Sequence, residues 1–143
     1  MNDNFLQPRI DLEYSMLTRL MGVSISTHLL DEHLTVLWAN EAYYELIEYE
    51  KEEYESLFHN RPDLYMASCP ETAQIITSKI YEALANQTNG YEVVVRMPVK
   101  SGLKWVKVAT TFTDQLVDGV NLAYTVMTNI DDSMQGTLEK KIT

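Results

Sequence analysis

Three runs of strand-forming residues separated by two short turns occupy residues 90–131, and they limit the folds that this chain can adopt. The first run, Tyr91–Met97, and the second, Trp105–Phe112, are rich in β-branched and aromatic residues, which favour β-strands. Lys100-Ser101-Gly102 separates these two runs, and Asp118-Gly119 precedes the third; both are typical turn sequences. The pattern therefore predicts an antiparallel meander of three strands.

The alternation of side chains assigns two faces to this sheet. In the second strand Val106, Val108, Thr110 and Phe112 point to one side, which we expect to face the core. The third run, residues 120–130, carries apolar side chains on both faces, which is typical of a central strand. A large apolar face needs a cover, and helices earlier in the chain are the candidates.

The region before residue 90 alternates between strand and helix signals. Asn40 is a good N-cap for a helix that begins at Glu41, and Asn89-Gly90 is a stop signal for the last helix before the meander. The expected elements are, in order, strands at 23–29 and 34–38, a helix from Glu41, a helix at 51–58, an irregular connection at 59–70 and a long helix from Glu71 to about Asn89. The predicted fold is α+β, a five-stranded antiparallel sheet with its helices mainly on one face.

An amphipathic helix is predicted ahead of this domain. Ile10, Tyr14, Leu17 and Met21 recur at helical spacing, and Gly22 follows them. The apolar stripe can pack on the domain's own sheet or form a helix-to-helix homodimer contact, and the two are compatible. The expected organisation is an N-terminal extension at 1–22, a domain at 23–131 and a C-terminal linker at 132–143.

Composition narrows the function classes. A chain of 143 residues fits one domain, and a net charge of −10 argues against a nucleic-acid surface, which needs clustered Lys and Arg. The single cysteine, Cys69, excludes an internal disulfide and fits a reducing compartment.

No apolar run approaches the ~20 residues of a membrane span and no signal peptide is evident, so the chain as given is expected to be cytoplasmic. A membrane segment beyond Thr143 stays open if the chain is a fragment.

Several short motifs follow one another across residues 23–131. They are Leu30-Asp31, Trp38-Ala39-Asn40-Glu41-Ala42, Tyr49 with Glu53, Arg96 six residues before Gly102, Lys100-Ser101-Gly102 with Trp105-Val106, and Asn129-Ile130-Asp131-Asp132. In this order and spacing, and with this order of elements, the chain resembles the PAS domain family of small sensory modules. It departs from the family pattern at Glu48, where glycine is usual, at Val94, where an acidic residue is common, and at Asn129-Ile130-Asp131, where Asp-Ile-Thr is more usual.

The resemblance implies a cavity between the sheet and the helices, and flanking helices that pass a signal to an output domain. A bacterial sensor kinase of a two-component system and a cyclic-dinucleotide enzyme such as a diguanylate cyclase are the expected kinds of full-length protein. The signal-exit junction would be Asn129, Ile130 and Asp131. Alternation and the resemblance together nominate as pocket residues Leu37, Ile47, Tyr65, Ile76, Ile80, Val95, Val108 and Tyr124.

Motifs for cofactors and catalysis do not match. Cys69 lies outside the helical cysteine motif of flavin-reactive PAS domains, and residues 71–87 contain no histidine to ligate haem. His28, His33 and His59 lack metal-ligand spacing and are interpreted as surface residues. Nucleophile elbows, phosphate loops and paired carboxylates are not found, so no catalytic residue is nominated. We expect no flavin, haem or metal, and leave the small-molecule ligand unidentified.

Two further predictions concern a charged pair and the tyrosines. Glu92 and Arg96 share a strand face and are interpreted as an ion pair of small energetic value at the surface or an interface, with a cavity-lining role as the alternative. The many tyrosines either orient a ligand or are ordinary core residues.

The hypothesis is a non-enzymatic PAS-type sensory or protein-interaction domain. The alternatives are a cone-shaped α+β enzyme or carrier of the ketosteroid-isomerase kind, which is disfavoured because no acidic residue stands alone on an apolar strand face, and a ligand-free dimerisation module.

Overall fold

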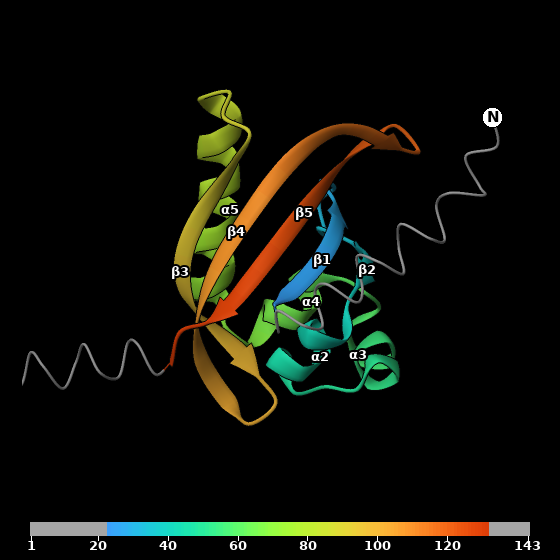
Figure 1. The fold of residues 1–143 in the computed structure, drawn as a ribbon, viewed down its shortest axis with the longest axis vertical. Coiled ribbons are helices and arrows are strands. Elements are labelled where there is room, and N and C mark those ends of the chain that lie inside the picture. The colour runs from blue at the N-terminus through green and yellow to red at the C-terminus, as the bar shows by residue number, and fades with distance from the viewer. Residues whose placement is uncertain (1–22, 132–143) are drawn as a thin grey trace, which may run out of the picture.

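The structure, a computed structural model, describes residues 23–131, and in them five strands form one antiparallel sheet in the order β2-β1-β5-β4-β3 (Figure 1). The strands are β1 (Ser24–Leu29), β2 (Val36–Ala39), β3 (Gly90–Val99), β4 (Gly102–Val117) and β5 (Val120–Asn129). The helices are α2 (Glu41–Ile47), α3 (Lys51–Phe58), α4 (Pro62–Tyr65), the short 3-10 helix η1 (Met66–Ser68) and α5 (Pro70–Ala85). The predicted α+β fold is confirmed, whereas the helix expected from Ile10, Tyr14, Leu17 and Met21 lies outside the described residues.

The predicted meander is present, and its third strand is central. β5 lies between β1 and β4, and β4 continues five residues past its predicted end at Phe112, through an irregularity between Phe112 and Leu116. At the start of β3, a Cβ on Gly90 would lie 1.9 Å from the carbonyl oxygen of Thr110, so only glycine fits there. The first and last strands of the domain pair directly, with Ser24 opposite Met127.

The junction between β2 and α2 is set by Asn40, as predicted. Its Oδ1 accepts hydrogen bonds from the backbone N–H of Tyr43 at 3.1 Å and of Ile25 at 3.0 Å, and its Nδ2 donates to the carbonyl of Val23 at 2.8 Å. The side chain therefore caps α2 and also fixes α2 against β1.

Two predictions for the region between residues 59 and 90 were wrong in detail. The segment 59–70 is not irregular, because Pro62 begins α4, and proline suits the first turn of a helix. The long helix α5 starts at Pro70 and ends at Ala85, four residues before the expected stop, because Gln87 adopts a left-handed backbone with φ of 56°.

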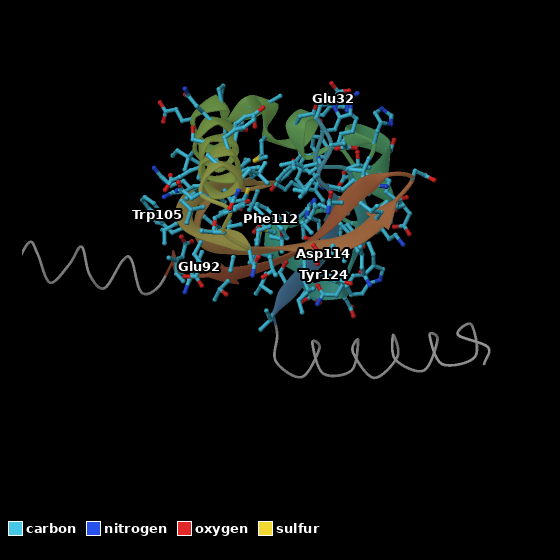
Figure 2. The ribbon with its side chains drawn as sticks, turned by 90° about the horizontal axis from the view of Figure 1, so that it is seen from above. Glu32, Glu92, Trp105, Phe112, Asp114 and Tyr124 are labelled. Atoms are coloured by element: carbon cyan, nitrogen blue, oxygen red, sulfur yellow. The ribbon has the colours of Figure 1, made fainter. Side chains whose placement is uncertain are left out.

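The helix α5 lies above one side of the sheet (Figure 2), and residues of α2, α3, α4 and α5 share one core with β3, β4 and β5. Ile47, Tyr54, Val95 and Val106 are fully buried between the two layers. The faces predicted for β4 are correct, since Val106, Val108 and Thr110 are buried on the helix side. Glu92 and Tyr124 lie on the opposite, outer face, away from the helices (Figure 2).

The prediction of an ion pair between Glu92 and Arg96 was wrong. Residues four apart on one strand are separated by about 13 Å, which is too far for a contact. Instead Glu92 pairs with Lys107 of the neighbouring strand at 3.5 Å, and the Arg96 guanidinium lies 5.6 Å from the ring centroid of Trp105.

Candidate functional site

A small cavity of about 60 Å³ lies between the inner face of the sheet and the helices α4 and α5. Most of its wall is apolar and comes from the β1–β2 turn, η1, α5 and β3, with Leu30, Leu34, Met66, Ile76, Ile80 and Met97. Among the described residues that line it, none is Asp, Glu, Lys or Arg. The cavity is therefore suited to an uncharged occupant.

The sheet side of the cavity carries a row of hydroxyl groups beside its apolar residues, which are Met97, Val108, Ala123 and Met127. Ser26 of β1 is paired with Thr125 of β5, Thr125 with Thr110 of β4, and Thr110 with Tyr91 of β3. All four residues line the cavity, and we call them the hydroxyl row. Thr110 and Thr125 are joined by a hydrogen bond of 2.9 Å between their hydroxyl oxygens. Burial raises the pKa of Tyr91, and hydrogen bonding with Thr110 partly offsets this.

His28 extends the polar wall beyond Ser26, and its interpretation as a surface residue was wrong. It lines the cavity, with Nε2 at 2.8 Å from the Ser26 hydroxyl and Nδ1 at 2.8 Å from the carbonyl of Leu34. Because a carbonyl can only accept, Nδ1 carries the proton and Nε2 accepts from Ser26. Burial lowers the pKa of His28 below its ordinary value, against opposing contributions from the Leu34 carbonyl and Asp31, so the ring is neutral near pH 7.

An aromatic cluster forms the other end of the cavity. Tyr43 and Tyr65 line it, and the hydroxyls of Tyr43 and Tyr54 are 2.9 Å apart. The Tyr65 hydroxyl donates to the carbonyl of Pro98, which ties α4 to β3. Burial raises the pKa of Tyr54 to about 12, so these phenols stay protonated at physiological pH. Tyr43 and Tyr65 are thus both core residues and part of the cavity wall.

The structure divides the predicted pocket residues into two groups. Tyr65, Ile76, Ile80 and Val108 line the cavity. Leu37, Ile47, Val95 and Tyr124 are not part of its lining.

Each residue of the second group has a structural reason for its position. Leu37 is 46% exposed, because Val36 is the buried residue of β2. Tyr124 lies on the outer face, because Ala123, Thr125 and Met127 are the β5 residues that point into the cavity. Ile47 and Val95 are buried in the core cluster without reaching the cavity.

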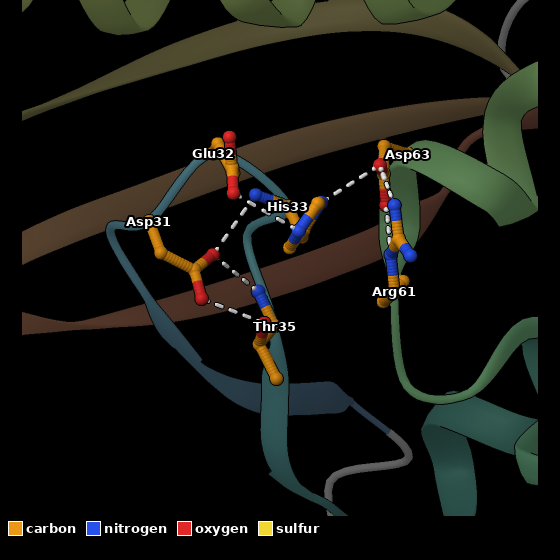
Figure 3. Close-up of polar contacts among 6 residues, drawn as sticks. All are labelled: Asp31, Glu32, His33, Thr35, Arg61 and Asp63. Atoms are coloured by element: carbon orange, nitrogen blue, oxygen red, sulfur yellow. Dashed lines mark hydrogen bonds and ion pairs between the residues drawn. The ribbon is translucent and has the colours of Figure 1, made fainter.

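A polar rim lies beside the cavity, around a wider hollow of about 340 Å³ that shares Leu30, Leu34, Met66 and Ile80 with it. At this rim His33 Nδ1 is 2.9 Å from Asp63 Oδ2 and its Nε2 is 3.3 Å from Glu32 (Figure 3). Hydrogen bonds from Arg61 lower the pKa of Asp63 to about 2. The rim therefore joins the β1–β2 turn to α4 beside the cavity.

Asp31 closes the β1–β2 turn from within. Its carboxylate accepts hydrogen bonds from the backbone N–H of His33 and from both the N–H and the hydroxyl of Thr35 (Figure 3). Burial raises the pKa of Asp31, but the bonds from Thr35 and His33 outweigh this and lower it overall. These contacts hold Leu34, which His28 contacts, in place.

No metal centre is found in residues 23–131, since no group of three or more His, Cys, Asp and Glu side chains gathers there in a way that could bind an ion. Cys69 lies just before α5, with its sulfur 3.1 Å from the Thr72 hydroxyl. Within the same range, no helix has both the length and the apolar character that crossing a membrane requires.

The residues predicted to form the signal-exit junction close the end of the β4–β5 ladder. The backbone N–H of Ile130 donates to the carbonyl of Trp105 at 3.0 Å, and Asp131 Oδ1 accepts from the N–H of Trp105 at 2.7 Å. Asn129 Oδ1 accepts from the N–H of Asp131 at 3.0 Å. The junction is thus bound to β4.

Comparisons with known proteins place this geometry in a known fold. No protein-family model and no curated protein matches the sequence. Solved structures do match. A PAS domain from Colwellia psychrerythraea has a TM-score of 0.61 at 18% identity, covering 86% of this chain and 98% of that one. A sensory box histidine kinase/response regulator from Burkholderia thailandensis has a TM-score of 0.64 at 10% identity, covering 90% and 92%.

The chain has the PAS fold. The N-terminal domain of a diguanylate cyclase with a PAS/PAC sensor from Marinobacter aquaeolei is also similar, with a TM-score of 0.54 at 10% identity, covering 78% of this chain and 98% of that one. Light-oxygen-voltage domains are among the similar structures as well. The fold predicted from the motifs is therefore confirmed.

One departure from the PAS sequence pattern now has a physical explanation. Glu48 replaces the usual glycine and has a left-handed backbone with φ of 68°, which glycine adopts without strain. Its carboxylate accepts hydrogen bonds from the N–H and the hydroxyl of Ser101 and lies 3.4 Å from Lys104. The hydrogen bonds from Ser101 also lower the pKa of Glu48. These contacts offset the backbone strain at this position of the PAS fold.

Proposed function

We propose that residues 23–131 are a non-enzymatic PAS-type sensory domain of a cytoplasmic bacterial signalling protein, which binds a small molecule in the cavity and passes the signal to a C-terminal output domain. The observation that carries this proposal is the cavity itself, whose wall is mostly apolar and carries the hydroxyl row and His28 on the sheet side. The similar folds include parts of a histidine kinase/response regulator and of a diguanylate cyclase, which supports an attached output domain.

The route from the cavity to the exit is short. Thr125 and Met127 of β5 line the cavity, and the same strand ends at Asn129. Asp131, two residues further on, is hydrogen-bonded to Trp105 of β4. A ligand that fits one arrangement of β5 better than another would therefore shift the exit residues, in proportion to its difference in affinity for the two arrangements.

The enzyme alternative is less well supported. A catalyst of the ketosteroid-isomerase kind needs an acid in an apolar site, where its pKa is raised. No acidic residue lines the cavity within the described part of the chain. The acids whose pKa values are lowered, Asp31, Glu48 and Asp63, lie outside the cavity lining and are held by hydrogen bonds.

Neighbouring residues of α5 provide a test. Ile76 lines the cavity and is 5% exposed, whereas Ile75 points outward and is 43% exposed. In the protein that carries its output domain, Ile76→Phe should fill the cavity and change output activity by at least about threefold, which corresponds to a shift of about 0.7 kcal/mol between the two output states. Ile75→Phe should leave output activity unchanged.

The measurement is output activity at equal folded concentration, with folding checked by circular dichroism. Equal output from the two variants and the wild type would contradict a sensory role for the cavity.

A ligand-free dimerisation module is the second candidate, and the small volume of the cavity favours it. In this case a homodimer would form through Ile10, Tyr14, Leu17 and Met21. Leu17→Glu would place a charge in that contact and should convert the dimer to a monomer in sedimentation experiments. A dimer that survives Leu17→Glu, or a wild type that is monomeric at high concentration, would contradict this arrangement.

A further inference from the structure

The hydroxyl row is an unusual set of residues for the inner face of a sheet. Central strands favour β-branched apolar residues, and a buried hydroxyl is costly unless it is hydrogen-bonded. Yet Ser26 is 1% exposed and Thr110 7% exposed, and both lie among apolar residues at the cavity wall. The row therefore concentrates hydrogen-bonding groups at one side of an apolar space.

The polar wall has hydrogen-bonding groups that its internal contacts do not use. Ser26 gives its proton to His28 Nε2, because Nδ1 of the ring donates to Leu34, so the Ser26 oxygen retains free lone pairs. Tyr91, Thr110 and Thr125 carry three hydroxyl protons, and the Thr110–Thr125 and Tyr91–Thr110 hydrogen bonds use two of them, which leaves one for a further acceptor. Ser26 and Thr125 are partners in the β1–β5 register. An acceptor at Ser26 and one donor among the other three hydroxyls are thus available along the row.

Charge and size limit the occupant further. The lining contains no ionised side chain within the described residues, and the burial of an unpaired charge costs several kcal/mol. A volume of about 60 Å³ corresponds to about two water molecules, hence to an occupant of only a few non-hydrogen atoms.

We propose that the cavity selects small uncharged molecules that carry one hydrogen-bonding group, such as short alcohols, ketones and amides. The hydroxyl row would recognise this group by hydrogen bonds. The inference rests on the proposed function, since it names the ligand class of the sensory cavity. The aliphatic part of the ligand would contact Met66, Ile76 and Ile80, opposite the polar wall. Gases without a polar group and charged metabolites of the same size would bind less well.

The methyl groups of the methionines that line the cavity give a direct measurement of ligand binding. Met66, Met97 and Met127 line the cavity, so their ¹³C-labelled methyl signals in NMR report its occupancy. The purified chain is titrated with ethanol, with the charged analogues ethylammonium and acetate, and with xenon. Ethanol should shift the three signals with saturation, and the charged analogues should not.

Two threonine variants identify the contribution of the row. Thr125→Val removes a cavity hydroxyl at nearly constant shape and should weaken ethanol binding about three- to tenfold while leaving xenon binding intact. Thr111→Val is the matched control, because Thr111 is exposed on the outer face, opposite Tyr124, and should leave ethanol affinity unchanged.

The outcomes separate this inference from the proposed function. Two results would overturn the ligand class alone, provided that xenon binds. One is an equal ethanol affinity in the Thr125→Val and wild-type proteins, and the other is tighter binding of acetate or ethylammonium than of ethanol. An absence of shifts with every probe, xenon included, would show a closed cavity and would overturn the ligand-binding role as well.

Discussion

A single side chain, Asn40, connects three parts of the chain. Its three hydrogen bonds reach Val23, Ile25 and Tyr43, and the side chain is buried. Asn40→Ala should lower the free energy of unfolding by about 2 kcal/mol, because it removes a helix cap and leaves the buried N–H of Ile25 without its acceptor. Urea unfolding followed by circular dichroism measures this.

Asn40→Asp is the informative control for this prediction. Aspartate keeps the acceptor for Ile25 and Tyr43 and loses only the donor to Val23, so it should cost less than alanine. Equal losses in the two variants would show that the cap contributes little.

His28 makes stability depend on pH. Burial lowers its folded-state pKa below the ordinary value of 6.5, so between the two values the unfolded chain binds more protons than the folded protein. The contribution of neutral His28 to the free energy of unfolding should therefore be fully present above about pH 6.5. Below this pH the free energy of unfolding should fall, by up to about 1.4 kcal/mol per pH unit.

Urea unfolding at about pH 7.5 and about pH 5.5 tests this linkage. His28→Asn, whose amide can still donate to Leu34, should show a smaller loss between the two pH values than the wild type. The exposed His59 has a left-handed backbone, which asparagine tolerates, so His59→Asn should retain the wild-type loss. If the free energy of unfolding of His28→Asn fell between the two pH values as much as that of the wild type, the titrating group would be another residue.

These two residues also show how far residue-level prediction from sequence can go. The role of Asn40 was predictable because a helix cap is a local signal that depends on the next three residues. The burial of His28 was not, because it depends on the β1–β2 turn folding Leu34 back over the strand. The hydroxyl row was missed for the same reason, since it becomes a row only in the register of four strands.

At the scale of elements, the last strand and the exit from the domain form one unit. Asp131 Oδ1 accepts a hydrogen bond from the N–H of Trp105, so the end of the domain is fixed to β4. Asp131→Ala should lower the stability of the isolated domain by about 1 kcal/mol, and in the full-length protein it should weaken the coupling of input to output.

Asp131→Asn retains an acceptor oxygen and should keep most of both properties. Melting curves of the isolated domain and dose–response curves of the full-length protein provide the two measurements. Normal regulation in Asp131→Ala would show that the contact with Trp105 only braces the sheet.

Strands and helices were predicted well because each has its own periodic signal, and α3 begins and ends at the predicted residues. The cavity lining was predicted in part. Alternation identifies the inward face of a strand, but whether an inward residue touches the cavity or the solid core depends on the helix opposite. Val108 and Val95 share the inward face, and only Val108 reaches the cavity.

For the whole molecule, the cavity volume bears on cofactors. Ligand pockets for drug-sized molecules occupy about 300–1,000 Å³, several times the 60 Å³ of the cavity. The adjoining hollow of about 340 Å³ is large enough, but Asp31, Glu32 and Asp63 line it and no Lys or Arg does within residues 23–131, so it does not suit a phosphate or a propionate. The purified protein should therefore show no visible absorbance. A stoichiometric flavin band at about 450 nm or a haem band at about 400–430 nm would contradict this prediction.

The pairing of β1 with β5 determines when the molecule can fold. Among the strands of residues 23–131, the one made last, Val120–Asn129, occupies the centre of the sheet, and its partner Ser24–Leu29 is made first. During synthesis β1 and β4 must each keep one edge unpaired until this strand has left the ribosome. Contacts between residues so distant in sequence slow folding, because a loop of about a hundred residues has to close before they form. The nascent chain should therefore depend on protection from aggregation until its last strand is complete.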